Sequence, residues 1–270
     1  MVVGAHPDDP EYTMAGTIAK FAKSGATVCM VSVSCGDKGH RTLESAELVK
    51  RRFAETQASA RVLGAERYIV LDGRDCELEP TLEFKRKLTK LIREFAPHLV
   101  FTHRTCDYHA DHRAVGQLLM DVSYFLGVPY WCPETPVPDV MPAVFFLRDK
   151  FTVPCPIRPD VIVDATDVQD IAADSLSCHE SQFFEWLVPE MPGAAAENPG
   201  VDGSVEAKRA YIKKFWFKGK ETDSVRFARQ MKYPEVFEQS EYGRQLSSAE
   251  IREIFPEGAI VADRTFSEMH

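Results

Sequence analysis

Short apolar runs alternate with longer segments of helical periodicity over the first 130 residues, and this alternation constrains the fold most. The runs at 2–5, 27–34, 68–71 and 99–102 predict strands, and the segments 13–23, 43–63, 82–95 and 115–125 predict helices. Parallel strands need crossover connections of this kind. We therefore expect a doubly wound, mostly parallel α/β sheet with helices on both faces and the strand order 3-2-1-4-5.

The second half of the chain lacks this regular alternation of apolar runs and helical segments. Runs at 144–147 and 161–163 predict strands, and 168–184 and 207–217 predict helices. The segment 129–142, with five prolines, and the segment 189–203, rich in Pro, Gly and Ala, predict loops. Beyond a short helix near Ser248, the chain after Tyr233 carries little signal. We expect a single domain over residues 1–270, with a core at 1–185 and a C-terminal extension at 186–270 that packs on it.

Composition narrows the classes of function. The formal net charge of −9 argues against nucleic acid or an anionic membrane surface as partner. No apolar run is long enough for a membrane span, no leader precedes the first strand, and the seven scattered cysteines are typical of reduced thiols. We expect a cytoplasmic protein with a small substrate, and a homo-oligomer is compatible with these features.

Two clusters of titratable residues follow two of the predicted strands. His6, Asp8 and Asp9 occupy a turn that Pro7 imposes at the end of the first strand. Zn²⁺ readily takes His nitrogen and Asp oxygen as ligands. The turn by itself leaves a second interpretation open, in which Asp8 or Asp9 caps the following helix and His6 is a structural residue.

The second cluster follows the fourth strand and comprises Asp107, His109, Asp111 and His112. Ligands of doubly wound sheets bind beyond the carboxyl ends of the strands, where the strand order reverses. The expected order places the first and fourth strands side by side at that point. Both clusters are therefore expected to form one site, although Asp111 as a helix cap and His109 as a solvated residue are alternatives.

These residues resemble the LmbE/PIG-L family of zinc-dependent N-acetylglucosaminyl deacetylases. The resemblance rests on Ala5-His6-Pro7-Asp8-Asp9, on Arg52-x-x-Glu55 ahead of Leu63-Gly64, and on Asp107-x-His109-x-Asp111-His112-Arg113-Ala114-Val115-Gly116. The segment His179-x-Ser181-Gln182 is similar to a weaker feature of the family. The resemblance implies a Rossmann-like three-layer sandwich and removal of the acetyl group from an N-acetylglucosamine-containing small molecule or glycoconjugate. The implied partner is a small acetylated amino sugar.

The resemblance also implies a single Zn²⁺, with Fe²⁺ as an alternative, held by His6, Asp9 and His112. Three protein ligands leave a position for water, whose pKa the metal lowers. Asp8 is implied as the general base that takes the proton of this water, and His109 as the opposing acid or oxyanion stabiliser.

Carboxylates behind His109 and polar residues around the sugar complete the expected site. Asp111 or Asp107 is expected to hold the tautomer of His109 and to keep its imidazole charged. The resemblance places Asp37 and Arg52 in the sugar pocket, whereas a surface pair of Arg52 with Glu55 is the alternative. We interpret His179 as structural.

Two other functions are compatible with parts of the sequence, and a third lacks the motif that it requires. A deacylase could act on another N-acyl amine. A cysteine hydrolase could use Cys106 beside His103 or His109, but it leaves His6, Asp8 and Asp9 without a role. A nucleotide-binding module would need a G-x-G-x-x-G turn or a P-loop, and the first strand is followed by neither.

Overall fold

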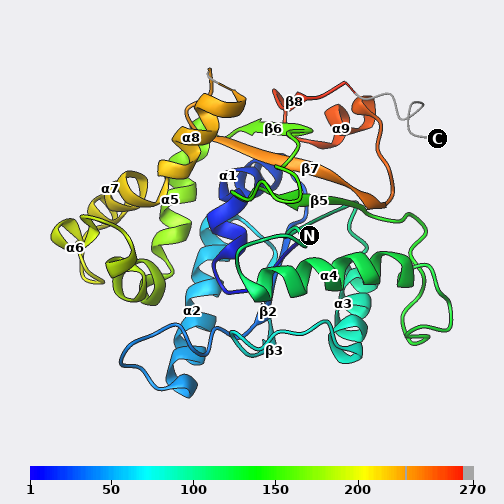
Figure 1. Cartoon of the computed structure of the whole chain (residues 1–270), viewed down its shortest axis with the longest axis horizontal. Helices are drawn as coiled ribbons and strands as arrows, with labels where there is room; N and C mark the ends of the chain where they lie inside the picture. Colours follow the sequence, from blue (N-terminus) through cyan, green and yellow to red (C-terminus); the bar gives the residue numbers. More distant parts are fainter. Residues whose placement is uncertain (229, 264–270) are drawn as a thin grey trace.

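Strands and helices alternate through the first half of the chain in the computed structural model, which describes residues 1–228 and 230–263. The strands are β1 (Val2–Gly4), β2 (Cys29–Ser34), β3 (Arg67–Gly73), β4 (Leu99–Thr102) and β5 (Ala143–Leu147); the helices are α1 (Asp9–Lys23), α2 (Ser45–Leu63), α3 (Leu82–Phe95) and α4 (Ala110–Phe125). The five strands are parallel in the order β3-β2-β1-β4-β5, which confirms the expected topology (Figure 1).

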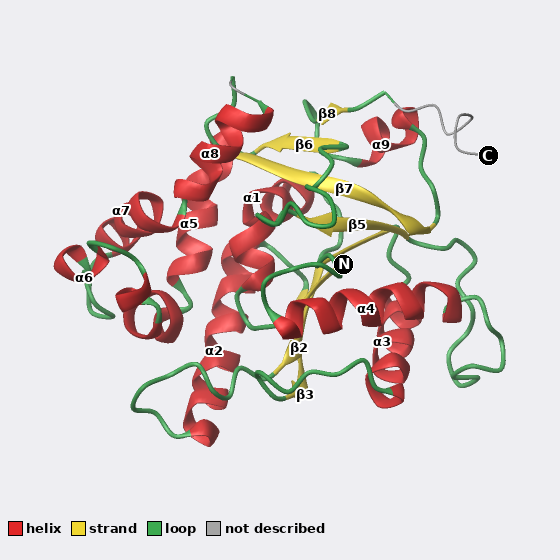
Figure 2. Ribbon diagram, viewed as in Figure 1, coloured by secondary structure: helices red, strands yellow, loops and turns green. Residues whose placement is uncertain are grey.

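Both faces of the sheet are covered by helices (Figure 2). Successive side chains of a strand point to opposite faces, so Val2 and Val3 belong to two different cores. Val2 lies in the core formed with α1 and α2, and Val3 in the core formed with α3 and α4. Burial on both faces explains why these strands read as continuous apolar runs in the sequence. No helix among the described residues is long and apolar enough to cross a membrane.

The second half supplies the remaining elements. They are β6 (Val161–Asp164), η1 (Thr166–Val168), α5 (Gln169–Ser177), η2 (Ser181–Trp186), η3 (Val188–Glu190), α6 (Ala194–Glu197), α7 (Val205–Trp216), α8 (Lys218–Phe227), β7 (Pro234–Gly243), α9 (Ser248–Ile254) and β8 (Ile260–Val261). The expected helix over 168–184 instead ends at Ser177, and the chain continues as the wider π-helical turn η2. The expected loop at 189–203 contains the short helix α6.

Strand β7 is the largest departure from the sequence analysis. It lies between β5 and β6 and is antiparallel to both, so residues 186–270 contribute a strand to the interior of the sheet. The division into a core of 1–185 and an extension therefore does not follow the sheet. Polar residues on β7 are buried, among them Glu235 and Gln239, and they interrupt the apolar pattern that identifies a strand.

Glu235 satisfies a local irregularity of α1. Met14 has non-helical dihedral angles, which kink α1. The Glu235 carboxylate accepts hydrogen bonds from the backbone N–H groups of Gly16 and Thr17 at 3.1 and 2.6 Å and from the Thr17 hydroxyl at 2.5 Å. Buried backbone donors require such partners, so the kink explains why an acidic residue occupies a buried position of β7.

Candidate metal centre and active site

The turn after β1 brings two carboxylates and an imidazole to the carboxyl end of the sheet. A Cβ atom on Gly4 would lie 2.7 Å from Cβ of Asp9, so glycine is needed for the close approach of α1. Asp8 has φ 132°, a backbone conformation that costs about 1–3 kcal/mol in a non-glycine residue. Neither carboxylate caps α1: Asp8 occupies the N-cap position without a side-chain hydrogen bond, and Asp9 points back toward β1. The capping interpretation is therefore wrong.

Asp9 lies at the centre of the cluster. Its Oδ2 accepts hydrogen bonds from the backbone N–H groups of Ala5 and His6 at 2.9 and 2.7 Å, and His103 Nε2 lies 3.1 Å from the same oxygen. Its Oδ1 lies 3.3 Å from His112 Nε2, and His6 Nδ1 lies 3.5 Å from Oδ2. The residues after β1 and those after β4 thus meet in one site, as the strand order predicted.

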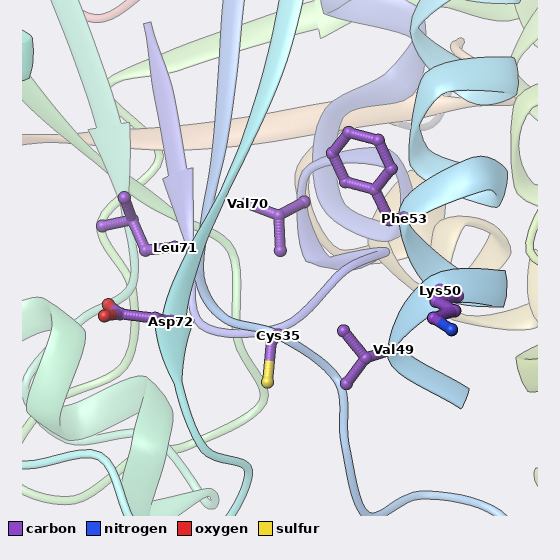
Figure 3. A pocket seen from close by; sticks show the side chains of 7 residues that line it. All are labelled: Cys35, Val49, Lys50, Phe53, Val70, Leu71 and Asp72. Atoms are coloured by element: carbon purple, nitrogen blue, oxygen red, sulfur yellow. The ribbon is translucent and has the colours of Figure 1, made fainter. Parts of the chain in front are cut away.

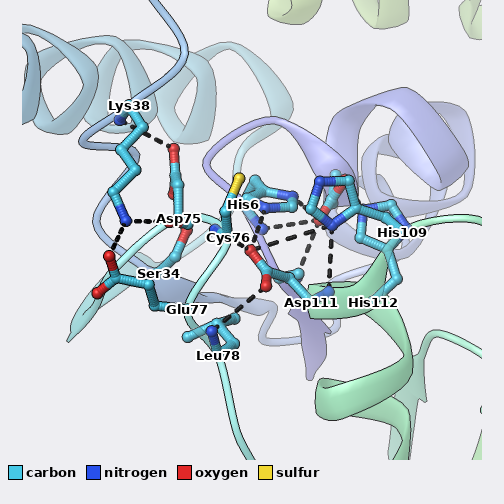
Figure 4. A network of polar contacts seen from close by, with 12 residues as sticks. His6, Ser34, Lys38, Asp75, Cys76, Glu77, Leu78, His109, Asp111 and His112 are labelled. Carbon is cyan, nitrogen blue, oxygen red and sulfur yellow. Dashed lines mark hydrogen bonds and ion pairs between the residues drawn. The ribbon is translucent and has the colours of Figure 1, made fainter.

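A carboxylate lies behind two of the three imidazoles that face Asp9, those of His6 and His112. Asp111 Oδ2 is 3.0 Å from His6 Nε2, as Figure 4 shows. Asp107 Oδ1 is 3.1 Å from His112 Nδ1. Each ring therefore directs its other nitrogen toward Asp9, which is the arrangement that orients histidine ligands in metal sites. The expectation that Asp111 or Asp107 holds the ring of His109 is wrong. Asp111 Oδ2 lies 4.0 Å from His109 Nδ1, beyond hydrogen-bond distance, and Asp107 Oδ1 accepts from the backbone N–H of His109 and binds the ring of His112.

His109 is the N-cap residue of α4. Its Nδ1 accepts a hydrogen bond from the backbone N–H of Asp111 at 3.1 Å, so a neutral ring carries its proton on Nε2. Burial and the charges of His6 and His112 lower the pKa of His109 below its usual value. Both features favour a neutral ring that donates from Nε2, and not the charged imidazole that the sequence analysis expected.

The surroundings shift the pKa values of the adjacent Asp8 and Asp9 carboxyl groups in opposite directions. Burial and the neighbouring charge of Asp9 raise the pKa of Asp8 to about 7, although the charges of His179 and Arg52 act in the other direction. Burial also acts to raise the pKa of Asp9, but His112 and His103 outweigh it and hold this pKa well below its usual value. The site thus holds a permanent anion next to a carboxyl group that can exchange a proton near neutral pH.

The donor set fits a divalent cation. Burial acts to lower the pKa of His112, but Asp9 and Asp107 outweigh it and raise this pKa to about 9; carboxylates likewise raise the pKa of His6. The carboxylates of the cluster therefore favour a positive charge in the space between His6, Asp9 and His112. His112 Nε2 lies 3.3 Å from Asp9 Oδ1 and His6 Nδ1 lies 3.5 Å from Asp9 Oδ2; each separation is close to the roughly 3.4 Å expected between tetrahedral ligands of zinc, although the two involve different oxygens of Asp9.

His103 is a site residue that the sequence analysis considered only as a partner of Cys106. It is buried, it stacks on His112 with ring centroids 3.9 Å apart, and it joins Asp9 and His112 in a set whose donor atoms lie within 4.8 Å of one another. His6, His109 and His112 form another such set. The available signal was the position of His103 directly after β4, at the same edge of the sheet as His6.

Arg52 and Asp37 lie in a buried polar network near this cluster. Arg52 is only 2% exposed; its Nη2 donates to the carbonyl oxygen of Gly39 at 2.8 Å and to Gln182 Oε1, and its Nη1 lies 3.5 Å from Asp75 Oδ2. Asp37 accepts hydrogen bonds from Asp75 N and Arg74 Nε, each at 2.9 Å.

Glu55 does not form the surface pair with Arg52 that was the alternative. It accepts hydrogen bonds from the backbone N–H and the hydroxyl of Ser181, at 2.9 and 2.7 Å, and it lies 3.2 Å from Arg51 Nε. His179 Nε2 is 2.8 Å from Glu11 Oε1, and both side chains are buried. The segment His179-x-Ser181-Gln182 thus connects the second half of the chain to α1 and α2 through three polar contacts.

The structure offers no support for a cysteine hydrolase. Among the described residues, no hydrogen bond connects the Cys106 thiol with His103 or His109, and burial raises the pKa of this thiol. A hollow of about 500 Å³ lies elsewhere, against the edge strand β3, and Figure 3 shows its lining. It is lined by Cys35, Val49, Lys50, Phe53, Val70, Leu71 and Asp72. None of these residues belongs to the His/Asp cluster.

Fold and site define a doubly wound α/β protein with a His/Asp cluster beyond β1 and β4. Residues 1–123 match the family described as PIG-L: GlcNAc-PI de-N-acetylase. The chain is 30% identical over 194 residues to the diacetylchitobiose deacetylase of Thermococcus kodakarensis, covering 68% of this chain and 70% of that protein. The chain belongs to the PIG-L family, and its relatives include several deacetylases of N-acetylglucosamine compounds.

Other comparisons agree on the fold and widen the range of activities. The N,N'-diacetylchitobiose deacetylase of Pyrococcus horikoshii has a similar structure, with a TM-score of 0.70 at 24% identity over 95% of this chain and 86% of that chain. The 4-oxalmesaconate hydratase of Pseudomonas putida is 25% identical over 194 residues, covering 69% of this chain and 74% of that protein. The relatives of this chain thus include a hydratase as well as deacetylases.

Proposed function

We propose that the chain removes the acetyl group from an N-acetylglucosamine-containing small molecule or glycoconjugate in a metal-dependent hydrolysis. One observation carries this proposal. Two imidazoles, each backed by a carboxylate, face Asp9 beside the buried carboxyl group of Asp8. The deacetylases among its relatives support the choice of substrate class.

His6, Asp9 and His112 would hold the cation, which we take to be Zn²⁺ or another divalent metal such as Fe²⁺. When bound, it would lower the pKa of water and polarise the acyl carbonyl. Asp111 and Asp107 position the two imidazoles, and His103 supports Asp9. Asp111 therefore acts through His6, and not through His109 as the sequence suggested.

Asp8 and His109 would move the protons. The Asp8 carboxylate takes a proton from the attacking water and can pass it to the amide nitrogen as the C–N bond breaks, so that the amine leaves in neutral form. His109 donates from Nε2 to the carbonyl oxygen as negative charge develops there. The direction of its pKa shift favours a neutral ring, so we assign it as an oxyanion stabiliser.

Arg52 and Asp37 are proposed to line the sugar pocket. Arg52 Nε is buried and has no hydrogen-bond partner among the described residues, so the guanidinium retains a donor. Asp37 accepts two strong hydrogen bonds but has further lone pairs for a sugar hydroxyl.

Metal analysis tests the ligand assignment. The variants His6→Ala, Asp9→Ala and His112→Ala should each lose stoichiometric metal after dialysis, because each loses one of the three ligands. His98→Ala removes an exposed imidazole outside the cluster and should retain the metal. Undiminished metal in the triple variant would contradict the assignment.

The reaction is tested by release of amine from a panel of N-acetylglucosaminides and other N-acyl amines, with the metal-loaded protein. Release from the glucosaminides is expected, and its rate identifies the preferred aglycone. The hydratase relative provides the second candidate, addition of water to a carbon–carbon double bond of an unsaturated acid. Consumption of such an acid without release of amine from any amide would favour that candidate.

A further inference from the structure

We propose that Tyr68 is a positioning residue of the active site, whose hydroxyl group holds the strained backbone of Asp8. This hydroxyl accepts a hydrogen bond from the backbone N–H of Asp8 at 3.3 Å. It donates a hydrogen bond to Glu11 Oε2, also at 3.3 Å. Tyr68 lies on β3, which β2 separates from β1, so the contact ties the turn after β1 to a distant strand of the sheet.

The backbone of Asp8 needs a partner from outside its own turn. Its φ of 132° is unfavourable for a residue with a side chain, and such a conformation persists only where the surroundings hold it. The carbonyl oxygen of Asp8 accepts a hydrogen bond from Tyr12 N at 2.8 Å, at the start of α1. The N–H group has its acceptor in Tyr68, because among the described residues no other hydrogen bond from it is found. Without the hydroxyl, a buried backbone donor would lose its partner.

Glu11 fixes the orientation of the Tyr68 hydroxyl. Burial and the charge of Glu11 raise the pKa of Tyr68 well above its usual value, so the hydroxyl keeps its proton. A hydroxyl that donates this proton to Glu11 turns its lone pairs away from the carboxylate, and one of them can accept from Asp8 N–H. The Tyr68 ring is buried in the core formed with α1 and α2, which limits its movement.

His179 supports Glu11 from the other side. The Glu11 side chain is fully buried, and its Oε1 lies 2.8 Å from His179 Nε2. Burial acts to lower the pKa of His179, but the charge of Glu11 outweighs it and raises this pKa, so a charged imidazole is favoured beside the carboxylate. A buried carboxylate needs such compensation. The segment His179-x-Ser181-Gln182, which the proposed function does not use, thus reaches the active site through Glu11 and Tyr68.

The effect on the reaction passes through Asp8. The hydrogen bond joins Tyr68 to the backbone of Asp8, so it acts by fixing where the carboxylate lies. This consequence rests on the proposed function, in which that carboxylate moves the proton. The hydrogen bond itself does not depend on the reaction.

Nuclear magnetic resonance of the full chain, with isotope label at the aspartate amides, tests the contact without any substrate. The signal that Asp8→Asn lacks belongs to Asp8. Tyr68→Phe should move the Asp8 amide proton upfield, because it removes the acceptor but keeps the ring in the core. Tyr233→Phe removes another buried hydroxyl, which has no partner among the described residues, and should leave the signal in place. An unmoved signal in Tyr68→Phe would overturn the proposal.

Kinetics distinguish positioning from simple stabilisation of the fold. With an accepted substrate, Tyr68→Phe should lower kcat by about tenfold to a hundredfold, the cost of a misplaced reacting group, while KM and metal content stay unchanged. Tyr233→Phe should keep the wild-type kcat. In the Asp8→Asn background, Tyr68→Phe should cause no further loss, because the carboxylate that it positions is already gone. Losses that multiply in the double variant would overturn the positioning role.

The two measurements keep this proposal apart from the proposed function. A wild type that hydrolyses no acetylated sugar would contradict the proposed function, whereas a shifted Asp8 signal in Tyr68→Phe would still support the hold on the turn. Hydrolysis by the wild type with an unchanged kcat in Tyr68→Phe would overturn the positioning role and leave the proposed function standing.

Discussion

Neighbouring residues of identical chemistry acquire different properties from their surroundings. The Asp9 carboxylate accepts two backbone hydrogen bonds and faces three imidazoles, of which His112 and His103 stabilise its anion most. The Asp8 carboxylate is buried beside that anion and therefore resists ionisation. A proton acceptor and a metal ligand can thus be assigned to adjacent positions, because the turn directs their side chains into different environments.

Replacing Asp8 tests its role as base. Asp8→Asn should keep the metal, because Asp8 is not among the proposed ligands, and asparagine tolerates positive φ better than alanine does. We expect kcat to fall by about two to four orders of magnitude, the usual contribution of a positioned base. Metal content and kcat must be measured on the same preparation. Near wild-type turnover with full metal would assign the proton transfer to another group.

The pKa of Asp8 also predicts how the stability of the metal-free protein changes with pH. The pKa of Asp8 in the metal-free fold is about 7, above its value of about 3.9 in an unfolded chain. The folded protein binds the extra proton, so this carboxyl group makes the metal-free protein less stable as pH rises from about 4 to 7. Asp8→Asn should lack this loss of stability. Chemical unfolding of both metal-free proteins at several pH values measures the difference.

Replacing Arg52 tests its proposed role in the sugar pocket. Lysine cannot reproduce the planar donor geometry that serves Gly39, Gln182 and Asp75, so Arg52→Lys should lower kcat/KM by about tenfold to a hundredfold. The neighbouring Arg51→Lys, whose side chain binds Glu185 at the protein surface, is the matched control. If both variants have unchanged kinetics with every accepted substrate, Arg52 only stabilises the fold.

The turn η2 is an element whose conformation follows from its partners. Helical periodicity continued through it in the sequence, but the chain leaves the α-helix after Ser177. Beyond Ser177, the side chains of His179, Ser181 and Gln182 bind polar side chains on α1 and α2. Their partners are Glu11, Glu55 and Arg52, respectively. Periodicity could not predict this break, because it arises from contacts between segments far apart in the sequence.

A substitution in this turn tests its contribution to stability. Ser181→Ala removes the hydroxyl that donates to the buried Glu55 carboxylate at 2.7 Å. Leaving a charged acceptor short of a donor should lower the free energy of unfolding by about 1–3 kcal/mol. Ser177→Ala is the control, because the Ser177 hydroxyl binds only a carbonyl oxygen within α5, and its cost should be smaller. Equal values in denaturant unfolding would refute the role assigned to Ser181.

The whole molecule depends on the C-terminal third for its sheet. Since β7 pairs with both β5 and β6, we propose that residues 1–270 form a single folding unit, as the sequence indicated. A chain truncated after residue 185 would expose the edge of β5 and lose the central Phe237. It should not fold, and the full chain should unfold in one transition by circular dichroism and by fluorescence.

A pair of variants on β7 tests the same point within the full chain. Phe237→Ala should lower the free energy of unfolding by about 3–5 kcal/mol, because the ring is fully buried among Phe101, Phe145 and Phe255. Tyr242→Ala removes a half-exposed ring from the same strand and should cost far less. A stable, cooperatively folding fragment 1–185 would contradict the proposal of one folding unit.

Sequence alone determined the order of the five parallel strands and the meeting of His6, Asp9 and His112. Both follow from local signals: apolar runs buried on two faces, the turn at Pro7, and the rule that places parallel strand ends at one edge of the sheet. Tertiary structure alone decided which carboxylate supports which imidazole, the inclusion of His103, and the position of β7. These features depend on side-chain directions and on polar groups buried against distant partners, such as Asp111 behind His6 and Glu235 on α1. No local pattern of polarity carries that information.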